Sequence, residues 1–190
     1  MVDTKDDTYM NAEEKKKVKL SNILFGIISN DSINLRFADN NDHVIICALY
    51  SDMKAFDMSI IPESDDIRQK LLLTQFRARN FSFDTMYGRE AQWIVERDGV
   101  AVGSLVVGEL DGALRLAEIA LVPEHRGGGL GTALIRAVQA AAVARHLPIR
   151  LQVHPLNPAR HLYGRLGFAE VGVGMANLEM EWHPPFSDAH

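Results

Sequence analysis

The sequence predicts an α/β fold with a mixed, mostly antiparallel sheet flanked by helices. Three segments between positions 91 and 122 have the patterns of strands. The pairs Asp98-Gly99 and Asp111-Gly112 join these segments, and Asp-Gly is a strong signal for a hairpin turn. A break dense in glycine, "PEHRGGGLGT" (123–132), then separates the last of them from an alanine-rich helical segment.

The elements follow from these patterns in order. Alternation predicts a strand at 32–39, and helical spacing predicts helices around 42–50 and at 65–81. Strands at 91–99, 100–112 and 114–122 form an antiparallel meander. A helix at 129–145 and a strand at 149–154 follow. The segment "NPARHLYGRLG" is a helix with Asn157 as N-cap, Pro158 at its first position and Gly167 as its stop. Strands at 168–173 and 177–182 complete the sheet.

Composition limits the classes of function. A chain of 190 residues with 47% apolar residues fits one domain: a polar N-terminal arm at 1–30, a single domain at 31–183 and a tail at 184–190. The net charge of −5 argues against a nucleic-acid partner. The sequence shows neither an apolar run long enough for a membrane span nor the cleavage pattern of a signal peptide, so we expect a cytoplasmic protein. Cys47 stands in an apolar context and is expected to pack as a small hydrophobe.

The glycine-dense break is typical of an anion site. Unpaired amides and the helix dipole favour negative charge at a helix N-terminus, and glycine lets the backbone approach a phosphate closely. Arg126 adds a positive charge. A tight structural turn is the alternative. A P-loop is excluded because no lysine precedes Thr132, and a dinucleotide fold is disfavoured because the preceding strands form hairpins.

Two motifs resemble the GCN5-related N-acetyltransferase (GNAT) family. "RGGGLG" (126–131) is similar to the loop Arg/Gln-x-x-Gly-x-Gly/Ala that binds the acyl-CoA pyrophosphate in that family. "NPARHLYGRLGF" (157–168) resembles its Asn-x-x-Ala-x-x-x-Tyr-x-x-x-Gly-Phe segment. The resemblance extends over residues 32–182.

The resemblance implies a donor site for acetyl-CoA. The strand before the loop and the strand after the helix would splay, and the pantetheine arm would lie between them. By position in the motifs, backbone groups of Ile119, Ala120 and Leu121 would hold the arm, and Asn157 would lie near it. The pyrophosphate would be bound by Arg126, Gly127, Gly128, Gly129, Leu130, Gly131 and Thr132.

The chemistry implied is direct transfer of the acetyl group to a primary amine, which needs a proton for the departing thiolate. Tyr163 is the expected general acid; alternatively its ring packs and its hydroxyl only orients the sulfur. Glu118 either takes the proton of the amine or binds the cation of the substrate. Gln152 and His154 stand where relatives carry glutamate, which puts a carboxylate base on that strand in doubt, and His154 is expected to be solvated or to cap the turn before Pro155.

The acceptor would be an amine-bearing small molecule or a protein amine, selected by residues 42–89. That region contains "DMKAFDMSIIPESDD" (52–66), whose acids could attract a cation, although a solvated loop is the simpler interpretation. No metal is expected, because the histidines lack metal-ligand spacing. The arm could mediate contacts in a homodimer. Two alternatives remain open: a non-catalytic acyl-CoA-binding or regulatory module of the same fold, and a nucleotide binder that shares only the loop.

Overall fold

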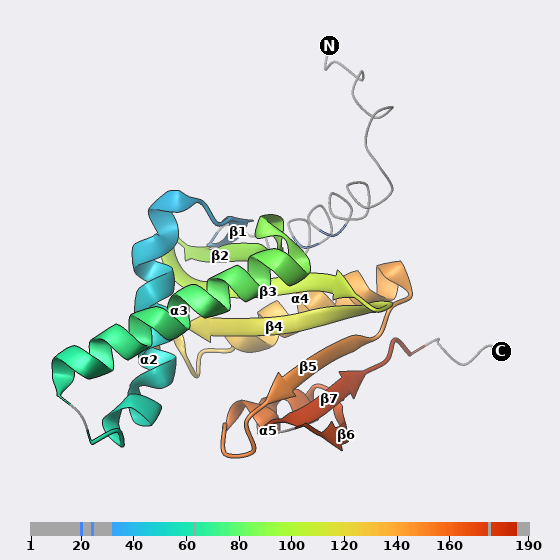
Figure 1. The fold of residues 1–190 in the computed structure, drawn as a ribbon. Helices are drawn as coiled ribbons and strands as arrows, with labels where there is room; N and C mark the ends of the chain where they lie inside the picture. Colours follow the sequence, from blue (N-terminus) through green and yellow to red (C-terminus); the bar gives the residue numbers. More distant parts are fainter. Residues whose placement is uncertain (1–19, 21–23, 25–31, 63, 175, 186–190) are drawn as a thin grey trace, which may run out of the picture.

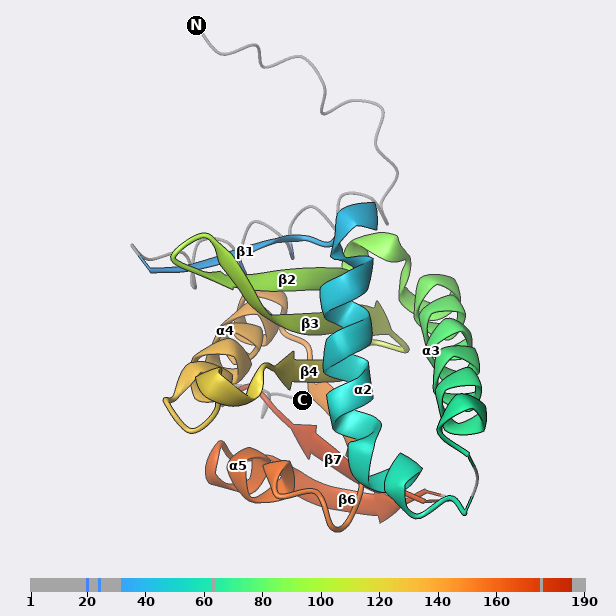
Figure 2. The ribbon, with the colours of Figure 1, turned by 90° about the vertical axis from the view of Figure 1, so that its left-hand side faces the viewer.

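The structure is a computed structural model and describes residues 20, 24, 32–62, 64–174 and 176–185. A seven-stranded sheet has the order β1-β2-β3-β4-β5-β7-β6. Two helices, α2 and α3, lie on one face of the sheet, and α4 and α5 lie on the other (Figures 1 and 2). The elements are β1 (Ile33–Phe37), α2 (His43–Ser59), α3 (Asp65–Tyr87), β2 (Gln92–Arg97), β3 (Val100–Leu110), β4 (Ala113–Leu121), α4 (Leu130–Arg145), β5 (Ile149–Val153), α5 (Ala159–Arg165), β6 (Ala169–Val173) and β7 (Leu178–Trp182).

The predicted fold class and the antiparallel meander are confirmed. β2 pairs with β3 and β3 with β4, each antiparallel. Asp98 and Asp111 have φ of 52°, and the following Gly99 and Gly112 have φ of 76° and 69°. Two consecutive residues in the left-handed region match the right-handed twist of a tight hairpin, which is why Asp-Gly occupies both turns. Among the strands that the structure describes, β4 and β5 are the only parallel neighbours, and all other paired strands are antiparallel.

The helix predicted around 42–50 is longer than expected. α2 continues to Ser59, so the first half of the segment expected as a solvated loop is helical. Residues 51–59 contain neither glycine nor proline, and Lys54 forms an ion pair with Asp57 at 2.8 Å on the same helix. The loop prediction for 52–66 was therefore wrong for its helical part, because that part has no helix-breaking residue and one of its acids pairs with a lysine on the helix surface.

The main core lies between the sheet and α4. An apolar stripe on α4, formed by Leu134, Ala137, Val138 and Ala141, is fully buried in it. Trp93 is 1% exposed, as expected of a core residue. Leu20 and Leu24 also belong to this core, although they lie within the predicted polar arm. All other residues of 1–30 lie outside the described part of the chain.

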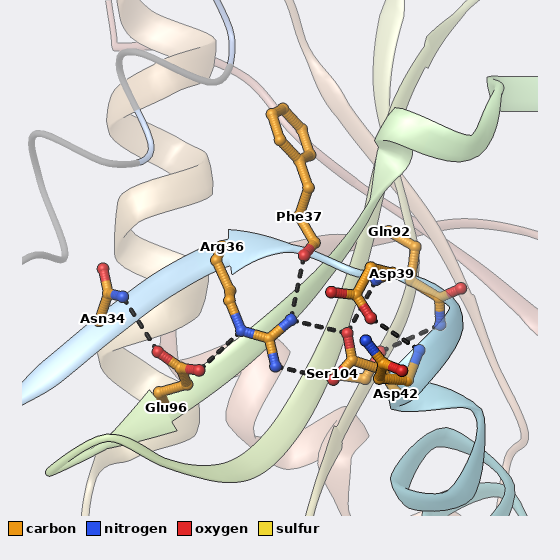
Figure 3. Close-up of polar contacts among 9 residues, drawn as sticks. Asn34, Arg36, Phe37, Asp39, Asp42, Gln92, Glu96 and Ser104 are labelled. Carbon is orange, nitrogen blue, oxygen red and sulfur yellow. Dashed lines mark hydrogen bonds and ion pairs between the residues drawn. The ribbon is translucent and has the colours of Figure 1, made fainter.

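A polar network fixes the start of α2 to the sheet (Figure 3). The guanidinium of Arg36 donates to both oxygens of Asp42 at 2.7 Å and, through Nε, to Glu96 at 2.7 Å. Asp42 is 5% exposed and also accepts from the backbone N–H of Asp39. Arg36 therefore holds the pKa of Asp42 below its usual value by hydrogen bonding to the carboxylate. The network sets the position of α2, which passes in front of β3 and β4 in Figure 2.

No helix among the described residues is long and apolar enough to cross a bilayer.

Candidate functional site

The central strands β4 and β5 separate along their length (Figure 1). They pair at Leu114 with Ile149 and at Arg115 with Arg150. β4 then runs on to Leu121 and β5 to Val153 without further pairing between them. Backbone groups of β4 beyond Arg115 that face β5 therefore lack a strand partner, and such groups are strong hydrogen-bonding sites for a ligand. The splay includes Ile119, Ala120 and Leu121, whose side chains pack in or against the core and leave only backbone for contacts.

A β-bulge in β4 sets the direction of Glu118. Val106 pairs with Glu118 but Val107 pairs with Leu116, so Ala117 is the extra residue. Leu114, Leu116 and Leu121 face the main core, as does Ile119. Without the extra residue, Glu118 would share the core face with Leu116, because side chains alternate along a strand. The bulge instead turns Glu118 towards α3 on the opposite face.

The glycine loop (residues 126–131) connects the end of β4 to α4. Gly127 and Gly129 have φ of 76° and 86°, a conformation that other residues adopt only with strain. A Cβ at Gly127, Gly128 or Gly129 would meet no atom within 4 Å, so this side of the loop is open. The first helical bond of α4 runs from the amide of Ala133 to the carbonyl of Gly129 at 3.0 Å. The amides just before Ala133 therefore have no partner within the helix, and the helix dipole adds positive potential at this end.

Side chains around the loop range from packed in the core to exposed to solvent. Leu130 is 2% exposed and belongs to the core, so only its amide is available to a ligand. Thr132 and Gly131 are half-buried in the first turn of α4. Arg126 is exposed, and its guanidinium donates to the carbonyl of Leu121 at 2.8 Å and forms an ion pair with Asp52 of α2. One carbonyl that the resemblance assigns to the pantetheine arm is thus bonded within the protein.

Tyr163 lies on α5 on the core side of the sheet. Its side chain is 7% exposed and packs edge-to-face on Phe168, with ring centroids 5.7 Å apart. Burial raises the pKa of the Tyr163 hydroxyl to about 12, because the phenolate would be poorly solvated. The hydroxyl consequently keeps its proton at neutral pH, as a donor must.

Glu118 is held by an arginine that the sequence did not indicate. Nε of Arg79 on α3 donates to Oε2 of Glu118 at 2.9 Å, and a second guanidinium nitrogen contacts Oε1. The two side chains are 9% and 13% exposed. The guanidinium carbon of Arg79 also lies 4.5 Å from the ring centroid of Phe83, a cation–π contact. Both oxygens of Glu118 are therefore already engaged.

The turn after β5 matches its predicted roles. Nδ1 of the exposed His154 accepts from the amide of Leu156 at 3.3 Å, so His154 stabilises the turn, as expected. Oδ1 of Asn157 accepts from the amide of Ala159 at 2.9 Å, which is the bond of an N-cap, although regular helix begins at Ala159. Gly167 has φ of 86° and ends the segment as predicted. Nε2 of Gln152 donates to Oε1 of Glu179 on β7 at 3.3 Å.

A separate cavity of about 510 Å³ lies at the other end of β3 and α4. Its lining includes Tyr87, Gly108, Glu109 and Arg145. The ion pair between Glu109 and Arg145 forms part of its wall, and Tyr87 and Arg145 are the last residues of α3 and α4, so the C-terminal ends of these two helices lie there. Its location argues against a role in binding at the glycine loop. Among the described residues, no three His, Cys, Asp or Glu side chains gather as metal ligands.

Comparison with known proteins identifies the segment that carries these features. Residues 88–170 match the family model for the acetyltransferase (GNAT) domain. This part of the chain is a GNAT domain. The match contains β2 to β5, the glycine loop, α4 and α5, and it confirms the resemblance seen in the sequence.

Solved structures share the fold of the GNAT domain. PaiA N-acetyltransferase from Thermoplasma acidophilum, in complex with coenzyme A, is 18% identical with a TM-score of 0.62 and covers 80% of this chain and 99% of its own. A GNAT-family acetyltransferase from Listeria monocytogenes is 19% identical with a TM-score of 0.56, covering 80% and 94%. Naa50 of Arabidopsis thaliana, in complex with the bisubstrate analogue CoA-Ac-MVNAL, is 14% identical with a TM-score of 0.53, covering 80% and 98%.

For three residues, the sequence does not indicate the contact that each makes with the site. Arg79, Asp52 and Glu179 contact candidate site residues that lie 39, 74 and 27 positions away, respectively. No local pattern predicts such pairs, because their geometry depends on helix packing and strand register. Glu179 lies on the strand predicted at 177–182, but that it faces Gln152 follows only from the pairing of β5 with β7.

Proposed function

We propose that the chain transfers the acetyl group of acetyl-CoA to a primary amine by direct attack of the amine on the thioester. The observation that carries this proposal is the splay of β4 and β5 beside a helix N-terminus preceded by open glycines. The splay offers unpaired backbone to an extended arm, and the helix terminus offers amides to a pyrophosphate. The CoA and CoA-analogue complexes of the similar PaiA and Naa50 structures support the same assignment.

The roles proposed for the donor site follow the described geometry. Amides from Gly127 to Thr132 would bind the pyrophosphate, together with Arg126 once its guanidinium turns from Asp52. Backbone groups at 119–121 would hold the arm, and the amide nitrogen of the Asn157 side chain is available beside it because Oδ1 is used in the cap. No metal takes part in this scheme.

Transfer itself requires proton movements that side chains at the splay can assist. The amine nitrogen bonds to the thioester carbon, the carbon–sulfur bond breaks, and the thiolate takes the proton of the Tyr163 hydroxyl. The proton that the amine nitrogen loses passes to solvent water, and solvent returns a proton to Tyr163 before the next turnover. Holding both reactants in line removes a large entropic barrier. Glu118, with both oxygens on Arg79, is suited to orienting the acceptor through that pair; a role as proton acceptor would require it to loosen this contact.

The test begins with calorimetric titration of the full chain with acetyl-CoA, CoA, NAD and ATP. Gly128 is the position to alter, because its φ is not positive and a Cβ there meets open space. Gly128→Glu adds bulk and negative charge, whereas Gly128→Ala is the matched control. We expect selective binding of the coenzymes by the wild type and the alanine variant, lost in the glutamate variant. Release of free thiol with primary amines then establishes transfer.

The alternatives give different results in the same experiment. Coenzyme binding without thiol release from any amine, unchanged by Tyr163→Phe, would favour a non-catalytic acyl-CoA-binding module. Binding of ATP or NAD in place of CoA would favour a nucleotide binder and contradict the proposal. Cytoplasmic location, a homodimer and the lack of a nucleic-acid partner stay predictions.

A further inference from the structure

The face of the sheet opposite the core has a second carboxylate at the splay. On β7, Leu178, Met180 and Trp182 pack in or against the core, so Glu179 and Glu181 point to the other face. Glu179 is paired across the strands with Gln152 of β5. Gln152 lies two residues past Arg150, the last β5 residue that pairs with β4. Glu179 therefore lies beside the splay, on the arm opposite Glu118 and on the same face.

Glu179 differs from the other acids near this face because it has no cationic partner among the described residues. Its one hydrogen bond is with the neutral amide of Gln152, at 3.3 Å. The neighbouring Glu181 is bound by Arg150 at 3.0 Å. The described acids of the segment 52–66 are all paired: Asp52 with Arg126, Asp57 with Lys54, Asp65 with Arg68, and Asp66 with Lys70. Those acids are therefore already compensated, whereas Glu179 is not.

Glycines of β6 and its following turn leave space next to this carboxylate. A Cβ at Gly172 would lie 3.3 Å from Oε2 of Glu179, and a Cβ at Gly174 would lie 3.6 Å from Oε1. A larger residue at position 172 would press against the carboxylate of Glu179, whereas a Cβ at position 174 would make ordinary van der Waals contact with it. Glu179 is half-buried, so its charge is only partly screened by water, and a cation brought to it would be bound more strongly than on the open surface.

We infer that Glu179 binds a cationic group of the acceptor, other than the amine that reacts, so that the acceptors are molecules with two or more amino groups. This inference rests on the proposed transferase function. The non-reacting amino group of the acceptor, as an ammonium ion, supplies the cationic partner that Glu179 lacks and fixes one end of the acceptor. The other amino group, neutral when it reacts, is then directed to the splay, where the thioester carbon would lie.

The test uses the full chain, acetyl-CoA and α,ω-diamines of three to six carbons, each compared with the monoamine of the same length. Thiol release gives kcat/KM for every amine. In the wild type we expect at least one diamine to exceed its monoamine by tenfold or more. Glu179→Gln keeps the size and the hydrogen bond but removes the charge, and it should reduce this preference to below threefold.

Glu181→Gln is the matched control, because it is the same change two residues away on the same face, and it should keep the preference. Calorimetric titration of the preferred diamine into CoA-saturated protein should show about tenfold weaker binding for Glu179→Gln and no change for Glu181→Gln. If the active wild type shows no preference for diamines, or if the preference survives in Glu179→Gln, this inference is wrong and the transferase proposal still stands. Coenzyme binding with no turnover of any amine, and no diamine binding, overturns both.

Discussion

Asp52 on α2 and Arg126 at the start of the glycine loop form an ion pair across 74 positions of sequence. Their side chains are 38% and 46% exposed, so the pair contributes at most about 1 kcal/mol to stability. The location of the pair matters more, because the carboxylate of Asp52 binds the guanidinium of Arg126, the cation to which the proposed pyrophosphate would bind. Anion binding at the loop and the contact with α2 are therefore in competition.

Removal of this competitor should strengthen coenzyme binding. Asp52→Asn takes away a negative charge next to the proposed anion site, and we expect CoA to bind about threefold more tightly at low salt, less so at high salt because of screening. Calorimetry at two ionic strengths measures this. Arg126→Ala should instead weaken CoA binding. Weaker binding in Asp52→Asn would mean that Asp52 holds Arg126 in its binding position.

The buried pair of Arg79 and Glu118 should behave differently in stability experiments. Both side chains are nearly buried, and removal of one partner leaves an uncompensated charge, which costs about 3 kcal/mol or more. We expect Arg79→Met to lower the free energy of unfolding by that order, and Arg79→Met with Glu118→Gln to lower it less. Urea unfolding of both single variants and the double variant gives the coupling. Additive effects would show that the pair is not coupled.

Tyr163 should affect turnover and not binding. If its hydroxyl donates the proton to the thiolate, Tyr163→Phe lowers kcat about 100-fold, within the range for general acid catalysis, and leaves the Kd of CoA unchanged. Tyr87→Phe, a half-buried tyrosine at the far end of α3, is the control. Full activity in Tyr163→Phe would assign the hydroxyl to packing alone.

The raised pKa of Tyr163 also predicts the shape of the pH profile. A general acid works while it is protonated, so its contribution is present below its pKa and is lost as the pH rises through about 12. An ordinary tyrosine would already be half deprotonated at about pH 10. We therefore expect no fall in kcat between pH 8 and about 10 in the wild type. A basic limb in that interval that disappears in Tyr163→Phe would contradict the burial of the hydroxyl.

The parts of the fold that follow from local chemistry could be predicted. Both two-residue hairpin turns require positive φ, which Asp-Gly pairs adopt readily. Gly127 and Gly129 likewise have the left-handed backbone that only glycine adopts freely. Asn157 and Gly167 mark the limits of α5 for similar reasons. These signals depend on a few neighbouring residues, so they survive in any tertiary context.

The direction of Glu118 could not be predicted in this way. Simple alternation from Leu114 and Leu116 places residue 118 in the core, and only the extra Ala117 reverses it. A bulge depends on how two strands align, and no residue type marks this one. The same limit applies to Arg79, since a helix must first be packed on the sheet before its side chains can meet Glu118.

Gly103 connects the meander to the donor site and gives a last prediction. A Cβ at Gly103 would lie 2.6 Å from the carbonyl oxygen of Ala120 and 2.6 Å from a methyl group of Leu121. Both contacts are shorter than real atoms allow, and one is with backbone, so β4 must shift in Gly103→Ala. The shift falls on the residues proposed to hold the pantetheine arm.

We expect Gly103→Ala to be less stable by about 2 kcal/mol, as in other overpacked cores, and to bind CoA at least tenfold more weakly. Thermal unfolding and calorimetry measure the two effects separately. Gly128→Ala adds the same methyl group in open space and should change neither by much. Unchanged CoA binding in a folded but destabilised Gly103→Ala would show that the arm does not depend on β4 at this point, because the strand would have moved without consequence for the coenzyme.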